Sequence, residues 1–338
     1  MHQLYSIIRD VEKTHSGLGN ALAFSIICVK ARMCLLNVAP SGTGKSVITN
    51  TLKKTHLDCV KLDSVTRSGL RDFKEQFTNF WGLVVIDDMA KVDSLYSRKH
   101  TITSFAELCY SHDISKHTFT CTIVIDGFFG SAVINIQPVI LAELVADSEW
   151  EAVTQDKTVR YYHLYRPKAP VPFLPDVNVD WGISLDLVHK PRHDFKLYDK
   201  LGDIASIQWS DARVMEHLDV LLKATAALDR RQEVRAEDFQ ILHRLMKPMI
   251  IERSIFHKVG FESGRYLETN LLAVLVEFAS WKDINLERIA RDYKISPTTA
   301  YRLLTEIKDW FEPSEPMSKR LVPKPGLRKV LKEAGVVR

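Results

Sequence analysis

The sequence predicts an α/β protein with a parallel sheet, followed by a helical region and a C-terminal helix-turn-helix module. Three observations lead to this fold class. An apolar run enters a glycine-rich loop near residue 40, another apolar run ends in two aspartates at residues 87 and 88, and strand-like and helix-like segments alternate up to residue 165. Alternating strands and helices are typical of a parallel sheet that is covered by helices.

The most specific motif is the loop Ala39–Ser46, which has the sequence A-P-S-G-T-G-K-S. It departs from the pattern G-x-x-x-x-G-K-[ST] only in the methyl group of Ala39. Such a loop points backbone N–H groups at a polyphosphate, so we expect Lys45 to reach the β and γ phosphates and Ser46 to hold Mg²⁺. The predicted nucleotide-binding residues are Ala39, Pro40, Ser41, Gly42, Thr43, Gly44, Lys45 and Ser46.

A second motif, Gly82–Asp88, is an apolar run that ends in two carboxylates. It predicts a buried parallel strand with its acidic end at the carboxyl edge of the sheet, where ligands bind. There Asp87 would coordinate Mg²⁺ and Asp88 would orient the water that attacks the γ-phosphate. Paired acids also cap turns, which is the structural alternative. Asp88 is one methylene shorter than the Glu common at this place, so we expect hydrolysis to be slow.

Other segments complete the expected sheet and its helices. The run Thr120–Ile125 is β-branched and ends at Asp126, so we expect it to be the next parallel strand. The remaining expected elements are a helix at Val47–Lys54, a strand at Cys59–Leu62, a helix at Pro138–Val153 and a strand at Thr158–Tyr165.

The composition is that of an intracellular protein with two or three domains. The chain has 338 residues, 46% of them hydrophobic, and a mean hydropathy of -0.10. No signal peptide and no run long enough to cross a bilayer are evident. The five cysteines form no C-x-x-C pair, which indicates a reduced, cytoplasmic setting. A metal site at His112, Asp113 and His117 is an alternative to a solvated loop, which we prefer, so Mg²⁺ is the only metal expected.

Positive charge is concentrated at the C-terminal end of the chain. Residues 281–338 contain 13 Lys/Arg and 8 Asp/Glu, whereas the first 280 residues contain 33 and 34. The last twenty residues, 319–338, contain seven Lys/Arg and one Glu. A polyanion such as DNA is therefore expected to bind at this end.

A proline-rich stretch separates the expected sheet from helical segments. Arg166–Asp180 contains four prolines and predicts a linker. Ser210 is then expected to cap a helix, with the apolar face Val214, Leu218, Leu221 and Leu222. After a turn, Ala236–Met246 predicts another helix.

Residues 284–307 have the pattern of a helix-turn-helix. A first helix has Leu286, Ile289, Ala290 and Tyr293 on one face, and Ser296 with Pro297 starts a second helix, backed by Ala300, Leu303, Leu304 and Ile307. Short hydroxyls and cations on the exposed face suit base edges and phosphates. The predicted DNA-binding residues are Ser296, Thr298, Thr299, Tyr301, Arg302, Thr305 and Lys308. A protein-docking module is the alternative.

Together, the loop A-P-S-G-T-G-K-S, the run V-V-I-D-D at Val84–Asp88, the strand that ends at Asp126 and the helical region resemble the AAA+ family of ATPases over residues 20–250. The order S-D-A-R, long helix, helix is similar to the G-D-A-R lid of origin-recognition initiators and clamp-loader-type proteins. The resemblance implies that Asp126 senses the γ-phosphate and that Arg213 is sensor 2. No arginine lies between Ser131 and Val159, so Arg160 is the candidate for the arginine finger.

The resulting division is an AAA+ nucleotide-binding domain at 1–166, a linker and helical lid at 167–258, a winged-helix-like domain at 259–315 and a basic tail at 316–338. We expect an ATPase, slow or stimulated by DNA, with Lys45, Asp87, Asp88, Asp126, Arg160 and Arg213 as its catalytic set and with ATP and Mg²⁺ as cofactors.

The preferred function is ATP-dependent binding of double-stranded DNA in replication initiation or helicase loading, as a homo-oligomer with a replicative helicase or another replication protein as partner. Alternatives are a ring-forming helicase or translocase and an ATP-regulated transcription or transposition regulator. A kinase that uses the same loop fits poorly with the lid and the helix-turn-helix.

Overall fold

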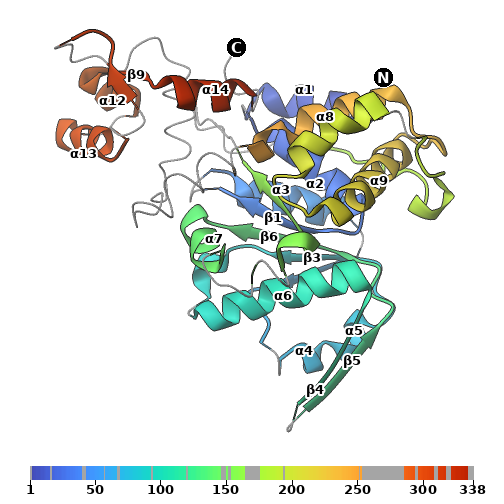
Figure 1. Cartoon of the computed structure of the whole chain (residues 1–338). Helices are drawn as coiled ribbons and strands as arrows, with labels where there is room; N and C mark the ends of the chain where they lie inside the picture. Colours follow the sequence, from blue (N-terminus) through green and yellow to red (C-terminus); the bar gives the residue numbers. More distant parts are fainter. Residues whose placement is uncertain are drawn as a thin grey trace.

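The computed structural model contains a central sheet, helices on both faces of it and a separate group of small C-terminal elements (Figure 1). It describes residues 2–15, 17–39, 43–56, 58–66, 69–92, 94–118, 121–145, 150, 154–163, 176–192, 195–250, 252, 285–293, 296–307, 311–316 and 321–333. Among these residues, no helix is long and apolar enough to cross a membrane. The predicted α/β class is confirmed.

The sheet has five strands, all parallel, in the order β2-β3-β6-β1-β7. Their bounds are β1 Cys34–Val38, β2 Cys59–Leu62, β3 Leu83–Ile86, β6 Ser131–Ile136 and β7 Thr158–Tyr162. Strands β1, β3, β6 and β7 are buried along their whole length, as expected for a parallel sheet that is covered on both faces. Their carboxyl ends form one edge of the sheet, which we call the carboxyl edge, and their amino ends form the amino edge.

Helices α6 (Leu95–Ser111) and α7 (Pro138–Val145) cover one face of the sheet (Figure 1). Alternate strand residues, such as Leu36, Ile86 and Ile134, pack against them in one hydrophobic cluster. Helix α7 lies within the helix predicted at Pro138–Val153; residues 146–149 and 151–153 of that prediction lie outside the described residues.

The other face is covered by a larger helical layer. It consists of α1 (Gln3–Glu12), α2 (Leu18–Lys30), α3 (Lys45–Thr55), α8 (Phe195–Ala205), α9 (Asp211–Leu228) and α10 (Ala236–Met246). Helices α9 and α10 match the predicted positions, and the predicted apolar face of α9 is buried. All these helices share one hydrophobic cluster with the second face of the sheet, so the segment that we expected to be a lid packs on α2.

The prediction that Thr120–Ile125 is a parallel strand is wrong. Strand β5 (Cys121–Asp126) pairs antiparallel with β4 (Asp113–Thr118), and this two-stranded hairpin projects away from the layers (Figure 1). The fourth strand of the parallel sheet is β6, five residues further along the chain. The sequence pattern did not separate two adjacent β-branched runs that pair with different partners.

The C-terminal elements include the predicted pair of helices, α12 (Leu286–Tyr293) and α13 (Pro297–Ile307), which contact one another. They are followed by an antiparallel hairpin of β8 (Phe311–Pro313) and β9 (Leu321–Pro323) and by helix α14 (Pro325–Glu333). The boundary predicted at residue 315 therefore cuts through a hairpin. The predicted helix at residues 267–279 lies outside the described residues.

Short elements complete the chain. They are α4 (Gly69–Asp72), α5 (Lys74–Phe77) and the 3₁₀ turns η1 (Met89–Lys91), η3 (Gln155–Lys157), η4 (Leu185–Leu187) and η5 (Lys247–Met249).

Candidate functional site at the carboxyl edge

The glycine-rich loop joins the end of β1 to the start of α3. Ala39 is fully buried, and its N–H donates to the carbonyl of Ile136 at the end of β6 (3.1 Å). Gly44 has φ +85°, which a side chain rarely adopts, and it precedes the first helical residue, Lys45. The loop thus leads into a helix N-terminus, where backbone N–H groups favour an anion. Pro40, Ser41 and Gly42 lie outside the described residues; Thr43 is buried, and Ser46 is exposed.

Lys45 lies inside the loop, with 8% of its surface exposed. Its ammonium group donates a hydrogen bond to the carbonyl of Ala39. Burial lowers the pKa of Lys45 to about 8, although the charge of Asp88 opposes the shift. Burial and the nearby Lys45 charge also lower the pKa of His163, which follows β7, to about 3. A bound anion would stabilise the Lys45 ammonium, so this environment is suited to a phosphate.

Asp87 follows β3 and has three donors around its carboxylate. Thr49 Oγ1 donates to Oδ1 (2.9 Å), and the Nζ atoms of Lys61 and Lys53 lie 2.7 and 3.4 Å from Oδ2. Burial alone would raise the pKa of Asp87, but the hydrogen bonds from Lys61 and Thr49 and the charge of Lys53 outweigh it, and the pKa is lowered. Asp87 is therefore held as a carboxylate near the start of α3.

Asp88 has a structural role that the sequence offered as an alternative. Its Oδ1 accepts a hydrogen bond from the N–H of Ala90 (3.0 Å) and caps the 3₁₀ turn η1. Burial lowers the pKa of Lys45 and the negative charge of Asp88 opposes this shift, so the carboxylate lies on the side of the glycine-rich loop. Capping fixes the orientation of Asp88, and a fixed carboxylate beside the loop is compatible with positioning a water.

A buried row of polar side chains, which the sequence analysis missed, connects the central strands below the loop. Asn37 Nδ2 in β1 donates to Asn135 Oδ1 in β6 (3.1 Å), and Asn135 Nδ2 donates to Thr49 Oγ1 in α3 (3.5 Å). Thr49 then donates to Asp87, so the row joins β1, β6, α3 and the end of β3. Both asparagines are fully buried. Buried polar side chains at next-to-last strand positions are costly unless paired, and the asparagine within S-A-V-I-N-I was the signal available.

These residues fit a nucleotide with Mg²⁺. The ammonium of Lys45 and the helix N-terminus supply positive charge, and the Asp87 carboxylate and the Ser46 hydroxyl are oxygen ligands of the kind that Mg²⁺ takes. Among the residues that the structure describes, no group of three or more His, Cys, Asp or Glu could hold a metal by itself. Mg²⁺ usually binds to one or two carboxylates together with substrate phosphates, which matches this sparse set.

The structure contradicts the role predicted for Asp126. Its carbonyl accepts a hydrogen bond from the N–H of Asn79, which lies four residues before β3 begins. Asp126 is therefore at the amino edge, whereas the glycine-rich loop follows the carboxyl end of β1. Asn135 occupies the position in the fourth strand of the sheet that was assigned to Asp126.

The structure also contradicts the role of an arginine finger for Arg160. Its side chain is 1% exposed and lies 3.0 Å from the Glu252 carboxylate. Its guanidinium also donates to the carbonyls of Gln155 (2.9 Å) and Gln208 (3.0 Å). A buried guanidinium held from several sides cannot extend into the site of a neighbouring molecule. Arg160 instead ties β7 to the helical layer.

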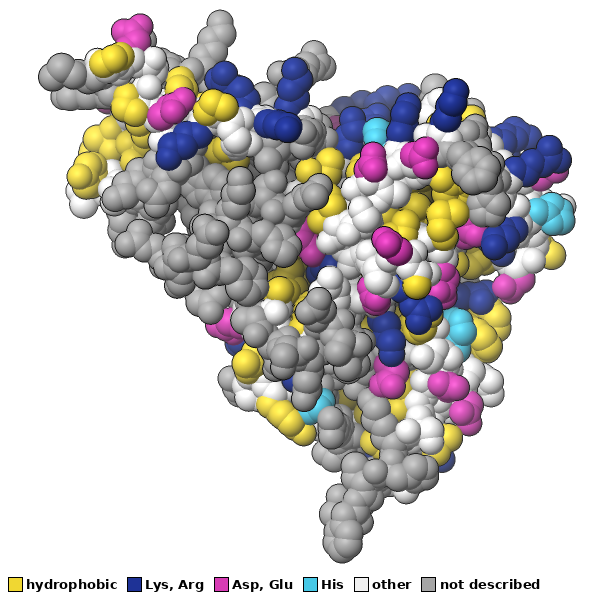
Figure 2. All heavy atoms as spheres, viewed as in Figure 1, with side chains coloured by type: hydrophobic (Ala, Val, Ile, Leu, Met, Phe, Trp, Pro, Cys, Tyr) yellow, Lys and Arg dark blue, Asp and Glu magenta, His cyan; other side chains and the backbone are white. Residues whose placement is uncertain are grey.

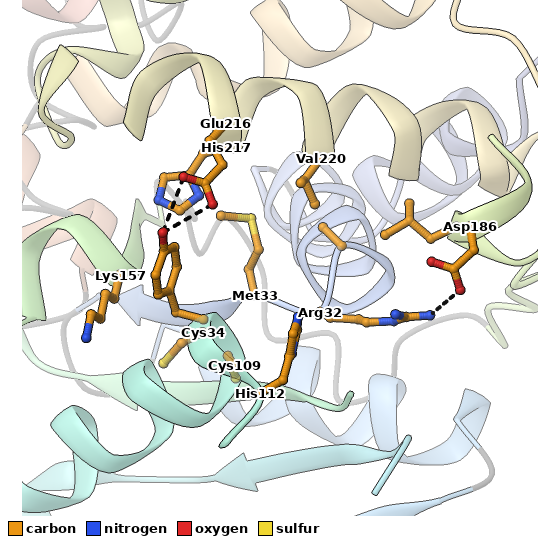
Figure 3. Close-up of a pocket in the computed structure, with 13 residues that line it drawn as sticks. Arg32, Met33, Cys34, Cys109, His112, Lys157, Asp186, Glu216, His217 and Val220 are labelled. Carbon is orange, nitrogen blue, oxygen red and sulfur yellow. Dashed lines mark hydrogen bonds and ion pairs between the residues drawn. The ribbon is translucent and has the colours of Figure 1, made fainter. Parts of the chain in front are cut away.

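Arg213 does not reach the loop in this structure, contrary to the prediction of a sensor role. It pairs with Glu216 (2.7 Å), and its Cζ lies 4.6 Å from the ring centre of Tyr110 at the end of α6. Ser210, at the start of the same helix, bonds to Asp156 just before β7. These contacts place Arg213 at the amino edge, about 15 Å from the loop if β1 rises by about 3.3 Å per residue. Figure 3 shows Glu216 and His217 at this end of the sheet.

The predicted DNA-binding face of α13 is exposed where the structure describes it. Ser296, Thr298 and Thr305 are exposed, and Tyr301 has 66% of its surface exposed. Ala300 is fully buried, as predicted, and Pro297 is the first helical residue. The side chains of Thr299 and Arg302, and all of Lys308, lie outside the described residues.

Comparison of the chain with protein-family models and with curated protein sequences finds no match.

Proposed function

We propose that this protein is an ATP-dependent DNA-binding ATPase of the AAA+ type, with its nucleotide site at the carboxyl edge. The observation that carries the proposal is the convergence of Lys45, Asp87 and Asn135 around the start of α3. They come from three separate elements; Asp87 and Asn135 are joined through Thr49 by hydrogen bonds, and the Lys45 ammonium bonds to the carbonyl of Ala39 in the loop. If the carboxyl edge had only a structural role, a buried ammonium beside a helix N-terminus would be a cost with no benefit.

In the proposed reaction, the loop N–H groups and Lys45 bind the phosphates and neutralise their charge. Mg²⁺ held by Asp87 and Ser46 would supply further charge neutralisation. Asp88 orients the attacking water, and the capped turn η1 keeps its carboxylate in place. Asn135 replaces Asp126 as the polar side chain that responds to the γ-phosphate, since it is bonded to the residue that positions Asp87.

The proposed DNA-binding part is the winged-helix-like unit of α12, α13 and the β8–β9 hairpin. What supports it is the exposed polar face of α13 together with the exposed Lys324, which precedes α14, and the exposed Arg328, Lys329 and Lys332 of α14. Dark-blue side chains are visible along the upper part of the molecule, where α14 runs (Figure 2). Cations near a recognition helix position DNA through its phosphates.

We place this activity in replication initiation or helicase loading in the cytoplasm, with a homo-oligomer as the working form and a replicative helicase or another replication protein as partner. ATP binding would shift the protein between two states that differ in DNA affinity. An ATP-regulated transcription or transposition regulator would use the same ATP-dependent change in DNA affinity with another partner protein.

The test is Lys45→Ala, measured by ATP binding and by DNA-stimulated phosphate release. We expect turnover to fall about 100-fold, because the main positive charge on the phosphates is lost. Lys54→Ala, an exposed lysine on the same helix, is the matched control and should keep full activity. Unchanged ATP binding and turnover in Lys45→Ala would refute the proposal. Tyr301→Ala or Arg302→Ala should weaken binding to duplex DNA while leaving turnover without DNA intact.

A second candidate function is a DNA translocase, and the β4–β5 hairpin favours it. The hairpin projects from the sheet and continues within five residues into β6, which contains Asn135 (Figure 1). A movement at Asn135 during hydrolysis can therefore be transmitted to the hairpin, whose β4 strand includes Lys116 and His117. ATP-dependent displacement of a strand from a forked duplex, lost in Lys116→Ala, would favour the translocase over the initiator.

A further inference from the structure

A cavity of about 210 Å³ lies at the amino edge of the sheet, whereas the glycine-rich loop lies at the carboxyl edge. We call it the amino-edge cavity. Its lining includes Lys30, Arg32, His56, Trp81, Ser131 and Trp181. They come from the end of α2, the end of α3, the starts of β3 and β6, and the segment before η4. None of them belongs to the proposed nucleotide site.

Arg32 has a backbone conformation that glycine would normally supply. Its φ is +59°, and the N–H of Met33 bonds to the carbonyl of Cys28 (3.0 Å), which is the helix-ending pattern in which glycine usually takes this position. An arginine is disfavoured there. The strained position puts the guanidinium Cζ 4.5 Å from the ring centre of Trp81, so the side chain has a use that glycine could not serve.

Trp81 forms an aromatic surface at the mouth of this cavity. Its side chain is 54% exposed, although it also contacts Phe129 with ring centres 4.7 Å apart. Trp181 lines the same cavity and meets the His56 ring edge-to-face at 5.0 Å. Trp181 is partly buried, whereas Trp81 is exposed. An exposed indole ring next to a stacked guanidinium is typical of surfaces that bind the faces of nucleobases.

Two polar groups of the lining have no hydrogen-bond partner among the described residues. One is the Ser131 hydroxyl, in a residue that is 1% exposed, and the other is His56 Nδ1. The His56 ring also bonds the backbone of Asp58, and burial lowers its pKa, so Nδ1 is a lone-pair acceptor. A buried hydroxyl and a buried acceptor are costly if left unpaired, and the donors and acceptors on a base edge would satisfy both.

The charge of the cavity selects against cations. Burial and the charge of Arg32 lower the pKa of Lys30, although Asp180 and Asp186 oppose the shift. Asp186 lies 3.4 Å from Arg32 but is 68% exposed, so this ion pair is weak and easily replaced (Figure 3). An anionic group would relieve the repulsion between the two cations.

The neighbouring cavity in Figure 3, of about 230 Å³, differs in this respect. Arg32 lines it too, but the polar rings of its lining have hydrogen-bond partners: Tyr110 bonds to Glu216, and the rings of His112 and His217 bond to backbone carbonyls. Among the described residues that line these two cavities, the buried side-chain atoms without a hydrogen-bond partner belong to Ser131 and His56 of the amino-edge cavity.

We propose that the amino-edge cavity binds one nucleotide unit, with the base against Trp81, its edge bonded to Ser131 and His56, and its phosphate near Lys30 and Arg32. The cavity is smaller than the roughly 300–1,000 Å³ typical of drug-sized ligands, which suits a single base. The unit is either a free nucleotide or part of a single strand. This site is independent of the glycine-rich loop.

The experiment uses full-length Lys45→Ala protein, so that the glycine-rich loop does not contribute. Labelled dT15 and, separately, AMP are titrated and followed by anisotropy and tryptophan fluorescence. Arg32→Gly suits the backbone at this position, and Trp81→Ala removes an exposed ring, so both variants should fold. We expect each to weaken binding at least about tenfold, as loss of base stacking does. Tyr96→Ala, an equally exposed aromatic residue on α6, should bind like the parent.

Ser131→Ala separates binding from stability. It removes an unpaired buried hydroxyl, so the melting temperature should stay the same or rise while ligand affinity falls about fivefold. Binding by AMP assigns the site to free nucleotides, and binding by dT15 alone assigns it to a strand. If neither ligand binds, or if folded Arg32→Gly and Trp81→Ala bind like the parent, the inference is wrong. The proposed ATPase activity is tested separately, by comparing the turnover of Lys45→Ala protein with that of the wild type.

Discussion

The two edges of the same sheet hold polar groups in different ways. At the carboxyl edge, Asn37, Asn135, Thr49 and Asp87 are bonded to one another in a row, in which Asn37 Oδ1 is the one buried atom without a partner among the described residues, and Lys45 is folded back onto the loop. At the amino edge, Ser131 and His56 have buried polar atoms without partners beside exposed aromatic rings. The first arrangement fixes the positions of charged groups, as phosphate chemistry needs, and the second leaves groups open to a ligand.

The comparison also teaches which residues can act on a nucleotide. Asp126 and Arg213 were the predicted sensors, but both lie at the amino edge. Asn135 lies at the carboxyl edge and was not expected there. The predictions below test whether place in the sheet, and not residue type, decides function.

The largest expected effect is at Asp87. Asp87→Asn removes the charge that would hold Mg²⁺, so ATP turnover should fall about 1,000-fold, close to the loss of a strong electrostatic contact in other enzymes. Steady-state phosphate release measures it. Asp126→Asn makes the same chemical change at the other edge and should retain at least half of the activity; equal losses in the two variants would break the comparison.

Arg160 lies in β7 between the two edges, and we expect its loss to affect stability. Arg160→Ala leaves the largely buried Glu252 carboxylate without its positively charged partner, although Tyr162 and Gln208 still donate to it, and this should lower the free energy of unfolding by about 3 kcal/mol. Denaturant unfolding measures the change. Folded Arg160→Ala protein should keep its turnover. If Arg160→Ala lost turnover and mixing it with Lys45→Ala protein restored it, Arg160 would act on a neighbouring molecule.

Asn135→Ala should separate ATP binding from hydrolysis. The side chain is bonded to Thr49, which positions Asp87, so turnover should fall about 30-fold, in the range for loss of one buried hydrogen-bonding group, while ATP binding changes little. Single-turnover hydrolysis and equilibrium binding distinguish the two effects. A large loss of binding with normal hydrolysis would mean that Asn135 only supports the fold.

The pH dependence of nucleotide binding should follow Lys45. Since its pKa in the ligand-free protein is about 8, the ammonium that binds phosphate is lost as the pH rises through 8, and affinity should fall about tenfold between pH 7 and pH 9. The free energy of unfolding should move the opposite way and rise from pH 8 towards the unfolded pKa of 10.5, because the unfolded chain binds the extra proton. Lys45→Met should abolish both trends.

The smallest effect is expected at Arg213. It pairs with exposed Glu216, so Arg213→Ala should change turnover less than about twofold and stability by no more than about 1 kcal/mol. A loss of turnover as large as that of Asn135→Ala would show that α9 moves over the loop during the cycle.

Much of the fold and part of the site could be predicted from local sequence. The glycine-rich loop, the strand that ends in Asp87 and Asp88, the helices α9 and α10 and the α12–α13 pair lie where the sequence placed them. Each depends on a short motif, a helix cap or a periodic apolar pattern, which act within a few residues.

Other features were decided only by the tertiary structure. Cys121–Asp126 and Ser131–Ile136 are both β-branched runs, and only their pairing partners distinguish a projecting hairpin strand from a central parallel one. The burial of Arg160, the place of Arg213 and the gathering of Lys30, His56, Ser131 and Trp181 at one cavity likewise depend on segments far apart in the chain. The sequence by itself determined the glycine-rich loop and the position of Lys45 in it, because the geometry of such a loop depends on residues that are adjacent in the chain. Which edge of the sheet each polar residue reaches was decided by long-range strand pairing, which no local pattern encodes.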